Sequence, residues 1–185
     1  MKKILLILLP LLFTQLSAQF GPKILIDSSL YAYDVVTVDL NGDSLKDIAF
    51  CERYLGNKVS FSLNLGGGIM TPPIEIDSVY QPWEIDAADM NGDGKPDLVA
   101  IQGNHQYGRI HIFENNYPSF SITVLDSAIK YLIDFRIADF DQNGTMDIVV
   151  AGGDSLHVFY NNGNLNFTKT VVQMQAFENY ALDVA

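Results

Sequence analysis

The chain reads Asp89-Met-Asn91-Gly92-Asp93-Gly94-Lys95-Pro-Asp97 near its centre, and a closely similar stretch occurs 50 residues before it and 50 residues after it. The first copy is Asp39-Leu-Asn-Gly-Asp-Ser-Leu-Lys-Asp47, and the third is Asp139-Phe-Asp-Gln-Asn-Gly-Thr-Met-Asp147. Every copy carries side-chain oxygens at positions 1, 3, 5 and 9 of nine. This spacing suits a tight turn that wraps a hard cation such as Ca²⁺.

Charge favours a metal ion in these loops. Two carboxylates about 4 Å apart repel by roughly 4 kcal/mol at an effective dielectric near 20, and Ca²⁺ removes that repulsion while accepting six to eight oxygens. The residue type at position 7 differs among the three copies, so we expect the backbone carbonyl at this position, and not the side chain, to bind the metal. The predicted ligands are Asp39, Asn41, Asp43, Leu45, Asp47, Asp89, Asn91, Asp93, Lys95, Asp97, Asp139, Asp141, Asn143, Thr145 and Asp147.

Three other interpretations of the loops are less favoured. They could be plain turns, because Asp, Asn and Gly dominate turns, but three copies in phase favour a metal. An EF-hand requires Glu at position 12, where this chain has Phe50, Ala100 and Val150. A β-roll that binds Ca²⁺ repeats at about nine residues, which the 50-residue period contradicts.

The residues around each loop predict short β-strands. An apolar run precedes each loop, another follows it, and an alternating run and a fourth short strand come next. Four antiparallel strands per repeat is the content of a propeller blade. We predict an all-β propeller with about three blades of an incomplete ring, as repeats 29–78, 79–127 and 128–176 and the start of a fourth at 177–185. Because propellers need four to eight blades, we expect further blades in a longer chain.

The N-terminus has the pattern of a secretory signal peptide. Lys2 and Lys3 precede an apolar run, and cleavage is expected after Ala18. We therefore predict residues 1–18 as the signal, residues 19–185 as the propeller portion, and a secreted or cell-surface protein without membrane insertion after cleavage. The mature charge of −13 (9 basic minus 22 acidic residues) argues against a nucleic-acid partner.

The loops and the flanking strands resemble FG-GAP and VCBS-type repeats, the bacterial relatives of the integrin α-subunit head. The resemblance covers residues 20–185 and rests on the pattern Asp-x-Asn-Gly-Asp-Gly-x-x-Asp before an apolar strand. It implies a propeller of seven or eight blades with Ca²⁺ in the loops within single blades. It does not imply a ligand, because propellers host unrelated functions.

The sequence favours a binding or adhesion module for an extracellular protein or glycan over an enzyme. The alternative is the propeller portion of a secreted polysaccharide lyase. A lyase would draw its base and its charge-neutralising group from His105, His111, His157, Arg53, Arg109, Tyr54 and Tyr107. His111 and His157 occupy equivalent places, which favours a role on the blade faces.

Two further features have simple structural interpretations. The single cysteine, Cys51, is expected to be a core residue. Tyr33, Trp83 and Tyr180 precede equivalent strands. We favour packing between blades for these rings over a platform for sugar stacking.

Overall fold

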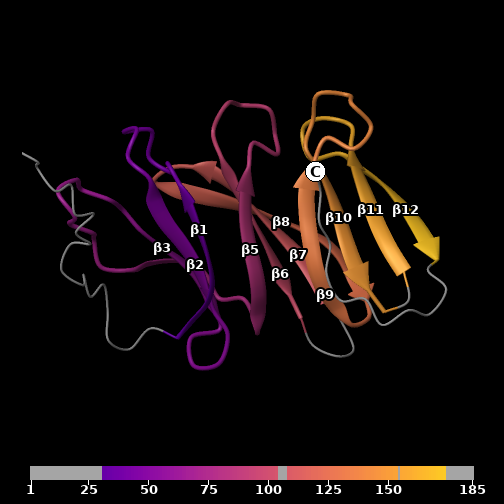
Figure 1. The fold of residues 1–185 in the computed structure, drawn as a ribbon, viewed down its shortest axis with the longest axis horizontal. Helices are drawn as coiled ribbons and strands as arrows, with labels where there is room; N and C mark the ends of the chain where they lie inside the picture. Colours follow the sequence, from indigo (N-terminus) through magenta and orange to yellow (C-terminus); the bar gives the residue numbers. More distant parts are fainter. Residues whose placement is uncertain (1–30, 104–107, 154, 174–185) are drawn as a thin grey trace, which may run out of the picture.

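The computed structural model describes residues 31–103, 108–153 and 155–173, which form β-strands joined by turns and loops (Figure 1). Twelve strands make three antiparallel sheets of four, and each sheet keeps its strands in chain order. No helix in this described part of the chain is long and apolar enough to cross a membrane. The sheets are the first, second and third blades of a β-propeller.

The blades repeat one plan along the chain. The first blade contains β1 (Ala32–Val38), β2 (Asp47–Glu52), β3 (Lys58–Ser62) and β4 (Ile74–Asp77). The second contains β5 (Pro82–Ala88), β6 (Asp97–Gln102), β7 (Gly108–Asn116) and β8 (Ser119–Ile129). The third contains β9 (Leu132–Ala138), β10 (Asp147–Gly152), β11 (Ser155–Asn161) and β12 (Phe167–Gln173).

The predicted all-β fold of four-stranded antiparallel blades is therefore confirmed. The predicted signal peptide at 1–18 and the start of a fourth repeat at 177–185 lie outside the described residues.

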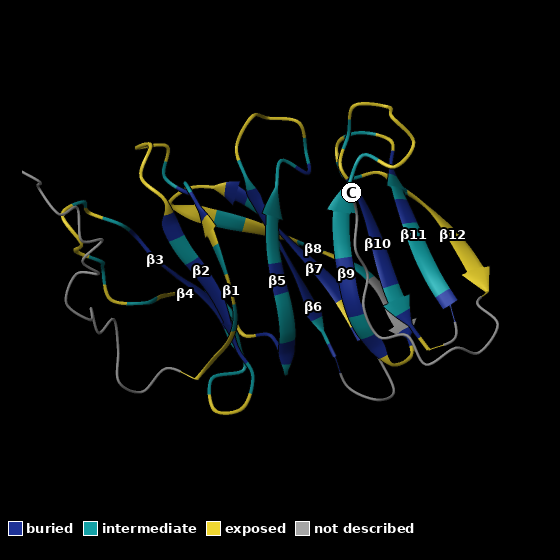
Figure 2. Cartoon of the chain, viewed as in Figure 1, coloured by how far each residue is buried: buried dark blue, intermediate teal, exposed yellow. Residues whose placement is uncertain are grey.

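The core lies between the blades. The second strands β2, β6 and β10 are almost wholly buried, as expected for apolar runs with both faces covered (Figure 2). One apolar cluster, which includes Phe61 and Phe113, joins the first and second blades. Another, which includes Ile112 and Phe135, joins the second and third. Each fully buried side chain of this size contributes about 1.5–3 kcal/mol, so stacking of blades is the main source of stability.

Cys51 belongs to the cluster between the first two blades and is fully buried. Burial, together with the charge of the neighbouring Asp34, raises the pKa of its thiol to about 12, although a backbone hydrogen bond with Asp34 lowers it. The thiol therefore stays protonated, and Cys51 is the core residue that the sequence predicted.

The two ends of the blades carry different connections. The acidic loops join the first strand to the second and project from the same edge of the three blades (Figure 1). We call this edge the loop end. The chain passes from a second to a third strand, and from one blade to the next, at the opposite end. The two ends can therefore serve separate chemistry.

A β-bulge lies at the opposite end of each first strand. In β1 the pairing with β2 shifts between Ala32 and Asp34, so Tyr33 is the extra residue. Equivalent shifts in β5 and β9 make Trp83 and Ile133 the extra residues. A bulge re-aims side chains and adds local twist, so this edge is irregular in all three blades.

Candidate functional site

The three acidic loops, residues 39–47 (loop 1), 89–97 (loop 2) and 139–147 (loop 3), share one backbone conformation. Positions 4 and 6 take a left-handed φ in every loop, whether or not the residue is glycine. The φ values are 78° at Gly42, 82° at Gly92, 59° at Gln142, 70° at Ser44, 83° at Gly94 and 88° at Gly144. The two departures from glycine therefore strain the backbone without changing the shape of the loop.

The aspartates at position 9 fasten each loop to its blade. In loop 2, Asp97 is fully buried, and its Oδ2 accepts the Met90 N–H at 2.9 Å. Its Oδ1 accepts the N–H of Asn115 on the third strand at 2.8 Å. Burial raises the pKa of Asp97, and the bonds from Asn115 and Met90 oppose the rise. Asp47 and Asp147 are also fully buried and accept the equivalent pair of backbone N–H groups.

The side chains at positions 1 and 5 accept backbone N–H groups from within the loop. In loop 2, Asp89 accepts the N–H of Gly92 at 2.7 Å and that of Gly94 at 2.8 Å. Asp93 accepts the N–H of Lys95, at position 7, at 2.8 Å. These bonds curl the chain around the carboxylates of Asp89 and Asp93. Loop 1 makes the same bonds with Gly42, Ser44 and Leu45 as donors and Asp39 and Asp43 as acceptors.

Position 3 contributes an oxygen to each turn as well. Asn41 and Asn91 each accept the N–H of the position 5 aspartate at 2.9 Å. In loop 3 this place is taken by Asp141, which accepts the N–H of Asn143 at 3.2 Å.

Loop 3 gathers its carboxylates most closely. One oxygen each from Asp139, Asp141 and Asp147 lies within 4.8 Å of the others. Among the described residues, this is the group of acidic side chains compact enough to hold one ion. The side chains of Asn143 and Thr145 both donate to the Asn161 carbonyl, the former at 3.0 Å. A set of carboxylate and amide oxygens fits a hard divalent cation such as Ca²⁺. The assignment of all fifteen predicted ligands stays a prediction.

Each of the first two loops is also tied to the following blade. The Asn115 side chain donates to the Leu40 carbonyl of loop 1 at 2.9 Å and to Pro96 of its own blade at 3.1 Å. The Asn161 side chain donates to the Met90 carbonyl of loop 2 at 2.7 Å. Both asparagines are buried. The order of a loop is therefore coupled to the docking of the next blade.

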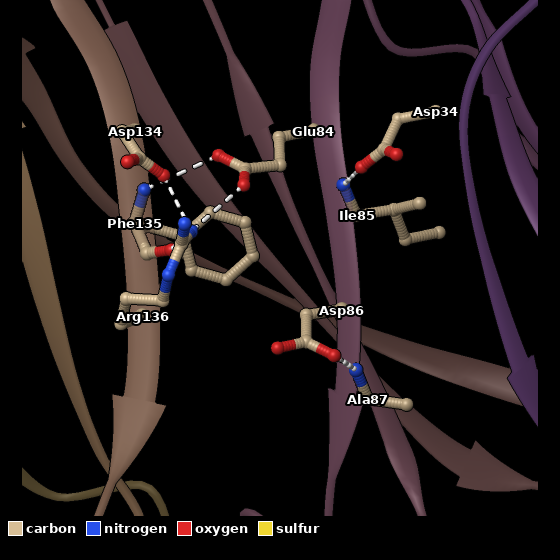
Figure 3. Close-up of polar contacts among 8 residues, drawn as sticks. All are labelled: Asp34, Glu84, Ile85, Asp86, Ala87, Asp134, Phe135 and Arg136. Carbon is tan, nitrogen blue, oxygen red and sulfur yellow. Dashed lines mark hydrogen bonds and ion pairs between the residues drawn. The ribbon is translucent and has the colours of Figure 1, made fainter. Parts of the chain in front are cut away.

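A second polar cluster lies near the starts of the first strands β1, β5 and β9, and Figure 3 shows its contacts. Asp34 of β1 accepts the Ile85 N–H of β5 at 2.9 Å. Fifty residues later, Glu84 of β5 accepts the Phe135 N–H of β9 at 3.2 Å. These hydrogen bonds hold each blade to the next along the first strands β1, β5 and β9.

Arg136 joins Glu84 to a further acid, Asp134. Its guanidinium lies 3.0 Å from Glu84 and 2.5 Å from Asp134 (Figure 3). Burial and the neighbouring Asp134 raise the pKa of Glu84 to about 7, despite the bond from Phe135 and the charge of Arg136. The sequence analysis missed this cluster, although acids at 34, 84 and 134 repeat with the same 50-residue period as the loops.

The aromatic residues beside this cluster pack across the boundary between blades. The rings of Tyr33 and Trp83 lie 5.2 Å apart, and the Arg53 guanidinium lies 3.7 Å from the centre of the Trp83 ring. Tyr54 meets Tyr33 edge-on at 6.3 Å. The contact between Tyr33 and Trp83 is the packing that the sequence predicted, while Tyr180 lies outside the described residues.

Three of the residues considered for a lyase lie on strands of the blades in the described part of the chain. His111 is buried, its Nε2 lies 3.1 Å from the Gln102 Oε1, and burial lowers its pKa. His157 holds the equivalent place in the next blade, opposite Val150. Arg109 is exposed on β7. His105 and Tyr107 lie outside the described residues.

Comparison with known families identifies the repeat. The profile of the FG-GAP-like repeat matches residues 39–100 and again residues 89–150, so each match spans two acidic loops. The chain belongs to the FG-GAP-like repeat family. A comparison with curated proteins found no match.

A solved structure supports the same architecture. The chain is similar to a lectin of Agrocybe aegerita, solved in work on its specific recognition of non-reducing terminal N-acetylglucosamine, with a TM-score of 0.53 and 22% sequence identity. The match covers 75% of this chain and 38% of the lectin chain, so this chain spans less than half the length of that relative. At this identity the likeness establishes the fold alone.

Proposed function

We propose that this protein is a Ca²⁺-binding β-propeller module that acts outside the cell by binding a glycan or a protein. One observation carries the metal assignment. Three loops 50 residues apart adopt the same left-handed turns, and in each the carboxylate at position 1 accepts backbone N–H groups of its own loop. Plain turns require neither a buried aspartate at position 9 nor three carboxylates drawn together in loop 3.

Calcium would act on stability rather than on chemistry. Metal loops in extracellular modules bind Ca²⁺ with dissociation constants of about 10⁻⁴–10⁻³ M. At ten times that constant, each site adds roughly 1.4 kcal/mol to the free energy of unfolding. Because the first two loops are bonded to the following blade through Asn115 and Asn161, bound metal would also hold neighbouring blades in place.

The glycan part of the proposal is supported by the similar lectin, which recognises a terminal N-acetylglucosamine. The acidic composition is consistent with it, since a formal charge of −11 disfavours nucleic acid. A protein ligand is the second possibility within the same binding function.

Export is part of the proposal and rests on the N-terminal sequence. Two lysines, an apolar run and a small residue at position 18 match a cleaved signal peptide. N-terminal sequencing of the exported protein tests this directly, with Gln19 as the expected first residue. An uncleaved N-terminus would contradict it.

We also propose that a further blade packs against the third. At position 2 of the loops, Leu40 and Met90 are 2% and 1% exposed beneath the following blade, whereas Phe140 is 37% exposed. A fourth blade would cover Phe140 as its neighbours are covered. Protection of Phe140 from photochemical surface labelling in the intact protein would support this, and full labelling would contradict it.

A glycan array in Ca²⁺ and in chelator tests the binding function. The expected result is binding to a subset of glycans that weakens in chelator as the propeller loosens. The double variant Asp139→Ala, Asp141→Ala should show the same weakening in Ca²⁺, and Glu75→Ala, an exposed acid on β4, is the matched control. An array without any bound glycan would leave a protein ligand as the binding function.

A further inference from the structure

A hollow opens where the first strands of all three blades approach one another at the opposite end. Its volume is about 440 Å³, within the usual range of small-ligand pockets. Each blade contributes two consecutive residues, and β9 adds an arginine. The lining residues are Tyr33 and Asp34, Trp83 and Glu84, Ile133 and Asp134, and Arg136.

The β-bulges explain why consecutive residues line one hollow. In a regular strand, neighbours point to opposite faces. Here the extra residues are Tyr33, Trp83 and Ile133, and each is followed directly by an acid. Every blade therefore presents an apolar side chain and a carboxylate side by side. Bulges that re-aim side chains in this way are common next to binding sites.

One wall of the hollow is aromatic and held in place. Tyr33 is 43% exposed and packs on Trp83. Arg53 stacks on Trp83 but does not line the hollow, so the guanidinium fixes the ring and leaves the space open. The two rings are inclined by 48°, and such a partly exposed aromatic pair offers an apolar surface at low entropic cost.

The other wall offers both hydrogen-bond acceptors and donors. Asp34 and Glu84 each accept one backbone N–H group of the next blade. Each carboxylate keeps further lone pairs that can accept hydrogen bonds from a ligand. Arg136 binds Glu84 and Asp134 through Nη1, and a guanidinium carries five N–H donors in all. Figure 3 shows Glu84, Asp134 and Arg136 together between β5 and β9, with Asp34 on the other side of β5.

The surface around the hollow is rich in tyrosine. Tyr31, Tyr54, Tyr80 and Tyr131 lie in the connections at this end, and each is 54–64% exposed. Tyrosine is enriched at binding surfaces because it combines a large apolar ring with a polar tip.

We infer that this hollow binds a neutral sugar unit, stacked on Tyr33 and Trp83 and hydrogen-bonded through its hydroxyl groups to the carboxylates and to Arg136. The inference deepens the proposed glycan-binding function and rests on it. Sugar hydroxyls both donate and accept, so they match a wall that mixes acids with an arginine. The apolar C–H face of a pyranose ring matches the aromatic wall.

Charge selects a neutral ligand over an ion. The carboxylates of Asp34, Glu84 and Asp134 repel a phosphate, a sulfate or an acidic sugar. Arg136, which lines the hollow, and Arg53 behind Trp83 offset two of these three carboxylates, so little net charge is left to attract a lysine or arginine side chain of a partner. A neutral polyol avoids the repulsion that an anion meets.

Trp83 is the single tryptophan of the chain, so its fluorescence reports binding in the hollow. We would titrate the full protein with the methyl glycosides of glucose, galactose and mannose and follow its fluorescence. Methyl glucuronide and lysine amide serve as the anionic and cationic comparison probes. The expected result is a saturable change in Trp83 emission with at least one neutral glycoside and none with either ion.

Two variants locate the site. Tyr33→Leu removes the stacking ring, and Asp34→Asn removes a charge while it keeps an acceptor for the Ile85 N–H. Each should weaken binding at least tenfold with an unchanged circular dichroism spectrum. Tyr80→Leu, at an exposed tyrosine of the same end that does not line the hollow, should leave affinity unchanged.

The alternative outcomes separate this inference from the proposed function. Sugar binding that both variants leave intact would overturn the hollow as the site, and glycan binding would stand. A response to lysine amide alone would overturn the neutral sugar in favour of a cationic peptide. No response to any probe would overturn the inference, while the glycan array would still decide the wider function.

Discussion

At the scale of single residues, the aspartates at position 9 have a structural role that does not depend on a metal. Asp97 is fully buried and accepts two backbone N–H groups, whereas Asp93 of the same loop is exposed. A carboxylate oxygen that accepts one N–H keeps a lone pair for a metal. The same side chain can therefore hold the loop in the absence of the ion and bind the ion when it is present.

We predict that Asp97→Ala destabilises the protein even without Ca²⁺. The variant leaves the N–H groups of Met90 and Asn115 without their buried acceptor, at about 1–3 kcal/mol each. We expect a total loss of about 3 kcal/mol in the free energy of unfolding, measured by urea denaturation in chelator.

Asp93→Ala is the control for this prediction. It should cost little in chelator and should lower the Ca²⁺ response of one loop. Equal losses for the two variants in chelator would show that position 9 has no special structural role.

The left-handed residues of the loops give a second prediction at this scale. Ser44 and Gln142 hold φ values of 70° and 59°, and an L-residue there costs roughly 1–2 kcal/mol relative to glycine, less the greater entropy of an unfolded glycine. Ser44→Gly and Gln142→Gly should each raise the free energy of unfolding by about 0.5–1 kcal/mol. Gly94→Ser should lower it by a similar amount, since the three loops have one shape. Destabilisation by both glycine variants in thermal melts would contradict this account.

At the scale of strands and blades, buried asparagines link each blade to the preceding loop. Asn161 donates to Met90 of the second blade and to Met146 of its own. We predict that Asn161→Ala costs about 2 kcal/mol, because it leaves buried carbonyl groups without donors. The adjacent Asn162 is exposed, so Asn162→Ala should cost less than 1 kcal/mol in the same denaturation assay. Similar losses at both positions would argue against the inter-blade role.

The raised pKa of Glu84 on β5 predicts that the stability of the protein depends on pH. The pKa of Glu84 is raised to about 7 in the folded protein from an ordinary value of 4.5, first by burial and then by Asp134. The folded state therefore binds this proton more tightly than the unfolded state does. The contribution of Glu84 is fully present below about pH 4.5 and is lost as the pH rises toward 7.

Glu84→Gln should remove that part of the pH dependence. The variant keeps a carbonyl acceptor for the Phe135 N–H and cannot ionise. Denaturation midpoints at pH 5, 6, 7 and 8 should fall less steeply in Glu84→Gln than in the parent protein. Parallel profiles for the two proteins would contradict the raised pKa.

The sequence was sufficient to predict the blades because their signal is local and repeated. Each loop and its flanking apolar runs follow one another within a few residues, and three copies in phase make the pattern hard to mistake. The buried role of Asp97 was harder to predict, because its second donor, Asn115, lies 18 residues away on another strand. The cluster of Glu84, Asp134 and Arg136 depends on how two blades stack, which no local pattern specifies.

At the scale of the whole molecule, we propose that stability and recognition are divided between the two ends of the blades. The loop end carries the acidic loops: loop 3 gathers three carboxylates, and loops 1 and 2 are bonded to the following blade. The opposite end carries the bulges, the aromatic wall and the exposed tyrosines. This separation lets the acidic loops keep one shape along the chain while the side chains at the other end differ from blade to blade.

The central claim is that Ca²⁺ bound in the acidic loops stabilises the stacked blades. Differential scanning calorimetry of the full protein in 5 mM CaCl₂ and in EGTA tests it most directly. Three sites at ten times their dissociation constants would add roughly 4 kcal/mol, which corresponds to a rise in Tm on the order of 10 °C. An unchanged Tm, together with no heat of Ca²⁺ binding at millimolar concentration, would contradict the account.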